Sequence, residues 1–123
     1  MKIESIAIGD EILSGTTVDT NLSALAQALE GCGLVIASHT VVGDSKESIS
    51  LAFKSAVRRS DVVIVSGGLG PTSDDITREA ASKAFKRKLR INTQALKHIQ
   101  KRFLLLRREM APTNIKQAMF PEG

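Results

Sequence analysis

The sequence predicts a three-layer α/β/α domain built around a mixed, mostly parallel sheet. Strand and helix patterns alternate along 123 residues without a long linker or a repeat, which is typical of this fold class. Apolar residues make up 42% of the chain and charged residues 24%, as in ordinary globular proteins. Phe is the only aromatic residue type and occurs four times, so we expect a core of aliphatic side chains.

The first half of the chain predicts two strands and two helices. Residues 2–8 read as a strand that Gly9 ends, and the polar residues 9–19 read as a loop. Apolar residues at helical spacing then predict a helix that begins after Asn21 and ends near residue 30. Residues 34–42 are rich in β-branched side chains and predict a second strand. A second helix follows, with Asp44 or Ser45 as its cap.

The second half begins with the strongest strand signal. Residues 62–65 are consecutive β-branched residues without polar alternation, which favours a central strand buried on both faces. A third helix is expected from Asp74 or Asp75 to about residue 88. A fourth begins at Asn92 or Thr93 and ends before Pro112.

A glycine-rich segment follows the predicted central strand, at the point where ligands bind to open α/β sheets. Glycine lets the backbone approach a ligand closely, and a helix N-terminus favours a phosphate. The segment lacks the ending of a Walker loop and the third glycine of a dinucleotide fingerprint. An ordinary turn with one capping Asp would need fewer special residues. The candidate ligand-binding residues here are Gly67, Gly68, Leu69, Gly70, Pro71, Thr72, Asp74, Asp75 and Thr77.

A second polar segment follows the first strand, and we expect it at the same sheet edge. Its candidate residues are Gly9, Asp10, Glu11, Gly15, Asp19 and Asn21. Asp44 follows the second strand, so Asp10, Asp44 and Asp75 are expected to meet. Carboxylates that lie so close repel each other unless a cation joins them, and oxygen ligands suit Mg²⁺. The alternative is that Asn21 and Asp44 only cap helices or lie in loops.

The remaining composition limits the function classes. A single cysteine allows no internal disulfide, and no apolar run is long enough to cross a membrane, so we expect a cytoplasmic protein that does not use a membrane. The two His residues lie far apart in sequence and predict no zinc site. Residues 1–77 carry five Lys/Arg against ten Asp/Glu, a net charge of −5, whereas residues 78–123 carry twelve against three, a net of +9. No aromatic residues for base stacking accompany the basic half, which argues against nucleic acid and favours solvated helix faces.

These motifs resemble the N-terminal domain of CinA, the competence/damage-inducible protein, within the molybdopterin-binding superfamily that includes MoaB and MogA. The resemblance rests on Gly9-Asp10-Glu11-Ile12-Leu13-x-Gly15 with Asp19-Thr20-Asn21, on Ser66-Gly67-Gly68-Leu69-Gly70-Pro71-Thr72-x-Asp74-Asp75-x-Thr77, and on Asn114-x-Lys116-Gln117-Ala118-x-x-Pro121. It implies a mixed sheet between helices and assembly into a homo-oligomer. Asp75 and Asp44 match the two functional aspartates of the molybdenum-cofactor enzymes.

The resemblance also implies activities. In CinA-type proteins this domain is associated with metal-dependent pyrophosphate hydrolysis of ADP-ribose-like nucleotides, so Asp44 and Asp75 are the catalytic candidates, with Asp10 as a further metal ligand. The first alternative is a molybdenum-cofactor enzyme, either an adenylyltransferase or a molybdate-inserting enzyme acting on a pterin. The second is a non-catalytic module that binds a nucleotide or a partner protein.

The resemblance further predicts that residues 1–123 form a single, incomplete domain. Relatives continue with a last strand and a second glycine-containing loop that closes the pocket. We therefore expect an uncovered sheet edge or apolar patch, an open ligand site, weak hydrolysis and a tendency to self-associate.

Overall fold

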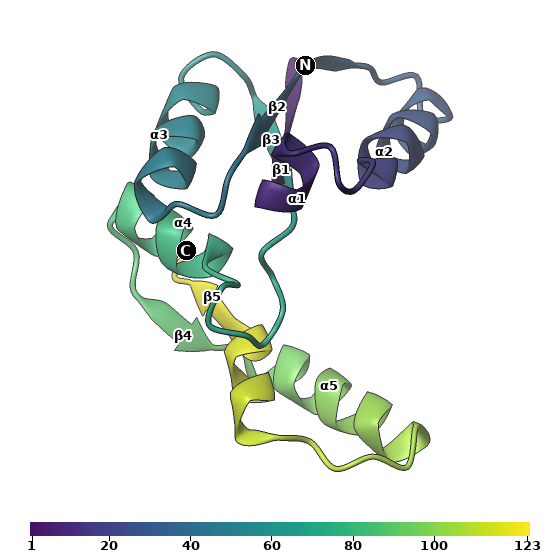
Figure 1. The fold of residues 1–123 in the computed structure, drawn as a ribbon, viewed down its shortest axis with the longest axis vertical. Helices are drawn as coiled ribbons and strands as arrows, with labels where there is room; N and C mark the ends of the chain where they lie inside the picture. Colours follow the sequence, from purple (N-terminus) through teal and green to yellow (C-terminus); the bar gives the residue numbers. More distant parts are fainter.

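The computed structural model describes all residues from 1 to 123 (Figure 1). Its elements, in chain order, are β1 (Ile3–Ile8), α1 (Asp10–Leu13), α2 (Thr20–Glu30), β2 (Ile36–Val42), α3 (Lys46–Ala56), β3 (Val62–Ser66), α4 (Thr77–Phe85), β4 (Leu89–Ile91), α5 (Thr93–Leu105), the 3₁₀ helix η1 (Pro112–Ala118) and β5 (Met119–Pro121). The first three strands form a parallel sheet in the order β2-β1-β3, and β4 pairs with β5 in a separate antiparallel pair.

The central strand of the sheet is β1, so the prediction that residues 62–65 are the central strand was wrong. Every residue of β1 is buried, because strands pair with both of its edges and α3 packs on the sheet. β3 pairs only with β1, its other edge is unpaired, and Val62 is 36% exposed. An unalternated β-branched run indicates helices or other packing on both faces, but it does not say how many strands lie beside it.

α3 packs on one face of the sheet, and α4 packs against α3 to complete the core. Ile6 and Ile8 of β1 pack against Ile49 and Phe53 of α3 and against Ala80 of α4. Figure 1 shows α2 on the other side of the sheet from α3, which gives the predicted three layers. No residue of α2 is buried, so this third layer is thin.

The helix caps partly differ from those expected. Ser45 caps α3 through a hydrogen bond from the N–H of Ser48, as predicted. Asp19, not Asn21, caps α2, because its carboxylate accepts from the N–H of Leu22 at 3.0 Å. The cap position of α4 is Ile76, which offers no side-chain acceptor.

Residues 89–118, from β4 to η1, form an arm below the sheet in Figure 1. The expected fourth helix is present as α5, but it ends at Leu105, and Leu106 is 57% exposed instead of continuing an apolar face. The short strands β4 and β5 were not predicted, because three residues are too few for a visible sequence pattern. The arm joins the sheet lobe where α4 contacts β4 and β5.

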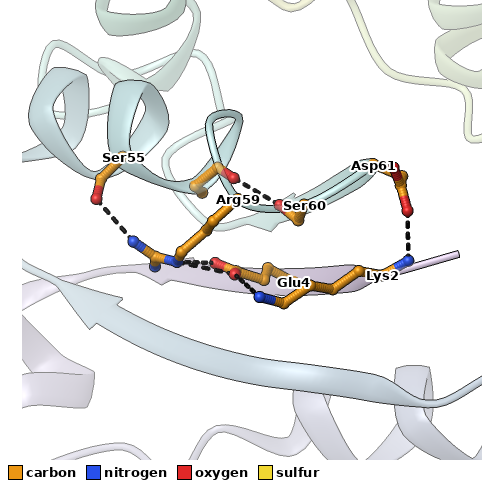
Figure 2. Close-up of polar contacts among 7 residues, drawn as sticks. Lys2, Glu4, Ser55, Arg59, Ser60 and Asp61 are labelled. Carbon is orange, nitrogen blue, oxygen red and sulfur yellow. Dashed lines mark hydrogen bonds and ion pairs between the residues drawn. The ribbon is translucent and has the colours of Figure 1, made fainter.

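A buried carboxylate is paired at the amino end of β1 (Figure 2). Glu4 is only 2% exposed, and the Nε of Arg59 donates to both of its oxygens, at 2.8 and 3.1 Å. The same guanidinium donates to Ser55, and the backbone N–H of Lys2 donates to Asp61. These contacts close the sheet edge opposite the predicted ligand site, because they lie at the start of the strand and the glycine loops follow its end.

An apolar groove of about 600 Å³ runs along the unpaired side of β3. Its lining includes Val63 and Val65 of β3, Phe85 of α4 and Phe120 of β5. An apolar groove therefore lies beside the unpaired edge of β3, and its link to a missing strand stays a prediction. No helix combines the length and the apolar character needed to span a bilayer.

Candidate functional site

The carboxyl ends of the three parallel strands bring the two predicted polar segments to one edge of the sheet. β1 leads into Gly9 and α1, β2 leads into Gly43 and Asp44, and β3 leads into the glycine loop. The N–H of Gly9 donates to the carbonyl of Val42 at 3.0 Å, which ties the first two of these connections together. The predicted edge is therefore formed as the sequence indicated.

The glycine loop after β3 needs its glycines. Gly67 and Gly68 have φ angles of +91° and +61°, in the left-handed region that disfavours side chains. A Cβ on Gly67 would also overlap the carbonyl oxygen of Ile8, and one on Gly68 would overlap the hydroxyl of Thr77. The loop thus lies directly against the end of the central strand.

Thr77, the first residue of α4, fixes this loop from the other side. Its hydroxyl donates to the carbonyl of Gly67 at 2.8 Å, and its backbone N–H donates to the carbonyl of Gly68 at 3.2 Å. The N–H groups of Gly67, Gly68 and Leu69 donate none of the backbone hydrogen bonds found in turns and loops. Unused N–H groups beside a helix N-terminus are what an anionic ligand requires.

Asp75 closes the turn that follows the glycines. Its Oδ2 accepts from the hydroxyl of Thr72 at 2.6 Å and from the N–H of Thr72 at 2.9 Å. The Thr72 hydroxyl is the main reason why the pKa of Asp75 lies below its usual range, and the N–H groups of Gly70 and Thr72 and the charge of Lys116 lower it further. Asp75 is therefore a charged carboxylate that shapes its own loop. Asp74 is exposed beside it.

Asp10 and Asp44 form a reciprocal pair. The N–H of Asp10 donates to Oδ2 of Asp44 at 3.1 Å, and the N–H of Asp44 donates to Oδ1 of Asp10 at 3.0 Å. Each carboxylate thus uses one oxygen to fix the other residue's backbone and leaves one oxygen without a hydrogen bond. This pairing, across 34 positions of sequence, confirms that the ends of β1 and β2 meet.

The donor set fits a magnesium ion only in part. No three His, Cys, Asp or Glu side chains are gathered closely enough to hold a metal ion, so Asp10, Asp44 and Asp75 do not form the expected three-carboxylate centre. Mg²⁺, however, is commonly held by one or two carboxylates together with substrate phosphates and water. The free oxygens of Asp10 and Asp44 suit that arrangement. Whether Asp44 and Asp75 share one ion with a bound phosphate stays a prediction.

The other predicted residues have separate surroundings. The Glu11 carboxylate folds back over Gly9, 2.7 Å from where a Cβ would stand. Gly15 has a φ of +76° with open space around it, and Asn21 is exposed in the first turn of α2. Asp19 serves α2 as its cap and lies 3.1 Å from Nε2 of His39. Leu69 is 41% exposed at the loop tip, and Pro71 is half-buried.

Two sets of contacts near these segments were not identified from the sequence. Nδ1 of His39 lies 3.2 Å from the hydroxyl of Ser5, and its Nε2 lies 3.1 Å from Oδ2 of Asp19 without forming a hydrogen bond. Nothing in the spacing of these residues signals those contacts. Lys116 of η1 donates to the carbonyl of Thr72 at 2.8 Å. Its place in the Asn114-x-Lys116-Gln117 motif was the available signal.

Comparison with known proteins identifies the family. The model of the family described as "Probable molybdopterin binding domain" matches residues 4–119. A CinA-like protein of Desulfosudis oleivorans is 44% identical over all 123 residues, and one of Geobacter metallireducens is 44% identical over 121. The chain spans about three-tenths of the length of each, 30% and 29%.

Solved structures agree with the fold. The crystal structure of the protein CinA from Thermoplasma acidophilum, described as of unknown function, is 37% identical with a TM-score of 0.84, covering 98% of this chain and 70% of that one. The molybdopterin biosynthesis enzyme MoaB of Thermus thermophilus, at 19% identity and a TM-score of 0.66 over 94% of this chain and 70% of its own, shares the fold. From the matched residues and this structural likeness together, the chain belongs to the molybdopterin-binding-domain family and, within it, to the CinA proteins.

Proposed function

We propose that this domain binds an ADP-ribose-like nucleotide at the glycine loop and, with Mg²⁺, hydrolyses its pyrophosphate bond in the cytoplasm. The observation that carries the proposal is the set of unused N–H groups at Gly67, Gly68 and Leu69, beside the N-terminus of α4 and at the same sheet edge as the Asp10–Asp44 pair. N–H donors suit phosphate oxygens, and paired carboxylates suit the cation that accompanies them.

The chain's own residues would bind and orient the substrate. The glycine-loop N–H groups would hold the pyrophosphate oxygens, and the free oxygens of Asp10 and Asp44 would hold the cation. Asp75 keeps Thr72 in place through two hydrogen bonds and so fixes the turn on which the phosphates would rest. A Mg²⁺ ion held there would supply Lewis-acid polarisation of a phosphoryl oxygen and would lower the pKa of a water ligand. In the proposed reaction, water would add to one phosphorus as the bridging P–O bond breaks, which would leave two phosphate monoesters.

A pterin is the second candidate ligand, because the family is described as molybdopterin-binding. MoaB-type neighbours share the fold, and a pterin pyrophosphate or phosphate would use the same loop N–H groups. A non-catalytic module is the third candidate, because the incomplete three-carboxylate centre leaves the cation with few protein ligands. Binding without turnover would favour that module.

The test is isothermal titration of the chain with ADP-ribose, with and without Mg²⁺, followed by a phosphate-release assay. We expect affinity to rise with Mg²⁺, and Asp44→Asn to remove most of that rise, because one free carboxylate oxygen is lost. Asp61→Asn is the matched control, since Asp61 pairs with Lys2 at the opposite edge of the sheet. Equal affinity for ADP-ribose with and without Mg²⁺ in the wild type and both variants would exclude a role for Mg²⁺ in binding. A pterin phosphate that binds while ADP-ribose does not would favour the second candidate.

A further inference from the structure

The third sequence motif, Asn114-x-Lys116-Gln117-Ala118, lies in η1, outside the two loops of the proposed site. Its residues nevertheless contact the glycine-loop region. Nζ of Lys116 donates to the carbonyl of Thr72 at 2.8 Å and lies 3.3 Å from Oε1 of Glu79 on α4. The side chain is only 22% exposed, so these contacts are partly shielded from water.

Thr72 is the residue on which this contact acts. Its N–H and hydroxyl both donate to Asp75, and its carbonyl accepts from the N–H of Asp75 at 3.3 Å as well as from Lys116. The turn from Thr72 to Asp75 is thus closed on itself and held from outside by one ammonium group. At the other end of the loop, Thr77 holds Gly67 and Gly68.

Charge gives Lys116 a second effect on the same turn. Asp75 places a carboxylate beside Gly70 of the loop, where it would repel a phosphate, and Glu79 places a second carboxylate beside Lys116. Lys116 faces both: it pairs with Glu79, and its charge favours the ionised form of Asp75. Arg78, which neighbours Glu79, donates only a long hydrogen bond of 3.4 Å to the carbonyl of Gln117, so it binds η1 far less firmly.

The geometry points to Lys116 as a positioning residue: from η1 it holds the Thr72–Asp75 turn and offsets the nearby carboxylates, so the glycine loop keeps a shape that accepts phosphate. This inference rests on the proposed phosphate site for its effect on ligands. Its effect on the turn itself does not depend on any ligand. η1 and the glycine loop are thereby coupled, although 44 positions of sequence separate Lys116 from Thr72.

The experiment measures loop conformation and ligand affinity separately. Lys116→Met keeps the length and apolar stem of the side chain but removes the donor and the charge. We expect amide hydrogen exchange to rise at Thr72–Asp75 in the absence of ligand, and the affinity for ADP-ribose to fall about tenfold, as for loss of a hydrogen bond to a charged group. Lys116→Arg keeps the charge and donors and should restore both.

Lys83→Met is the matched control. Lys83 lies on the same helix as Glu79 and pairs with Glu47 at 3.4 Å on the surface, away from the loop. Lys83→Met should change neither the amide exchange at Thr72–Asp75 nor the affinity for ADP-ribose, because exposed ion pairs contribute little. If Lys116→Met does not fold, Lys116→Gln keeps a polar head of shorter reach and should show the same increase in loop exchange.

The two hypotheses fail in different ways. Wild-type protein that binds no phosphorylated ligand overturns the proposed function, but increased exchange at Thr72–Asp75 in the Lys116 variants would still support the positioning role. Unchanged exchange at that turn in Lys116→Met or Lys116→Gln overturns the positioning role, whatever the wild type binds. Equal loss of affinity in Lys116→Arg and Lys116→Met would overturn it too, because the charge would then have no part.

Discussion

Glu4 is a charged residue in the most buried strand of the sheet, and its position depends on Arg59. A carboxylate that is 2% exposed is stable there only because a guanidinium donates to both of its oxygens. The hydrogen bond from Arg59 is the main reason why the pKa of Glu4 lies below its usual range, although burial acts in the opposite direction. The contribution of Glu4 to stability therefore depends on pH.

Glu4→Gln should lower the free energy of unfolding at neutral pH, with a difference from wild type that shrinks in acid. Because the folded-state pKa is depressed, the stabilisation is fully present above the unfolded value, about 4.3, and is lost as the pH falls through the folded value. Urea unfolding at pH 7, 5 and 3 measures this. Glu122→Gln, in an exposed pair with Arg90, is the control and should change little. A wild-type advantage that persists unchanged at pH 3 would contradict the assignment.

Gly67 and Gly33 illustrate two different reasons why a position requires glycine. Both have positive φ angles, +91° and +73°, but only Gly67 lies against another backbone, the carbonyl of Ile8. Gly33→Ala should cost about 1 kcal/mol, the conformational penalty alone. Gly67→Ala should cost about 3 kcal/mol, because the methyl group must also displace β1 or the loop. Chemical denaturation of the two variants compares them directly, and equal losses would mean that the close approach in the loop is relaxed at no cost.

At the scale of elements, α2 is the least anchored helix of the sheet lobe. None of its residues is buried, whereas α3 buries Ile49, Ser50, Phe53 and Ala56. Its N-terminus is held by Asp19, which caps the helix and lies beside His39 of β2. Local opening of a helix needs little free energy when few apolar contacts hold it.

We predict that the amide hydrogens of α2 exchange faster than those of α3, and that Asp19→Ala increases the difference. The substitution removes the cap, which typically contributes about 1 kcal/mol, and also the partner of His39. Hydrogen exchange followed by mass spectrometry resolves the two helices. Protection of α2 equal to that of α3 would show that its half-buried leucines hold it more firmly than its exposure suggests.

The elements that the sequence predicted well are those with long, regular patterns. β1, β2, α3 and the position of the glycine loop were all found, because apolar spacing and β-branched runs reflect local packing. The position of β3 at the edge of the sheet was not predicted, because strand order depends on contacts between distant segments. The four-residue helix α1 was read as a loop, because a single turn has no periodicity.

The sequence predicted where the candidate site lies in the fold, but not the hydrogen bonds that its side chains form. The meeting of Asp10 and Asp44 followed from two parallel strands ending at one edge. The engagement of Asp75 by Thr72 is local but depends on side-chain rotamers, which residue types do not specify. The reach of Lys116 across the fold depends on where η1 packs, and no spacing rule describes that.

At the scale of the whole molecule, the groove along β3 is an apolar surface open to solvent. It joins an unpaired strand edge to exposed aromatic rings, including Phe120 at 45% exposure. Surfaces of this kind commonly mediate association.

Sedimentation velocity should therefore show association that increases with protein concentration and that Phe120→Lys weakens, because a charge then stands at the groove. Leu104→Lys is the control: Leu104 is 77% exposed on α5 and does not line the groove. If both variants associate like the wild type, the groove does not mediate the contact. If Leu104→Lys alone dissociates, the interface lies on the arm instead.

The single thiol of the chain is a site for a label that would follow the local opening of α2. Cys32 is free and exposed in the turn after α2, between two glycines. A maleimide fluorophore or a nitroxide label attached there would report on α2 alone, with no cysteine to remove elsewhere. The same exposure means that air oxidation can join two molecules through Cys32, far from the apolar groove in sequence and independent of it. A covalent dimer of that origin separates on a reducing gel, whereas association through β3 does not respond to reductant.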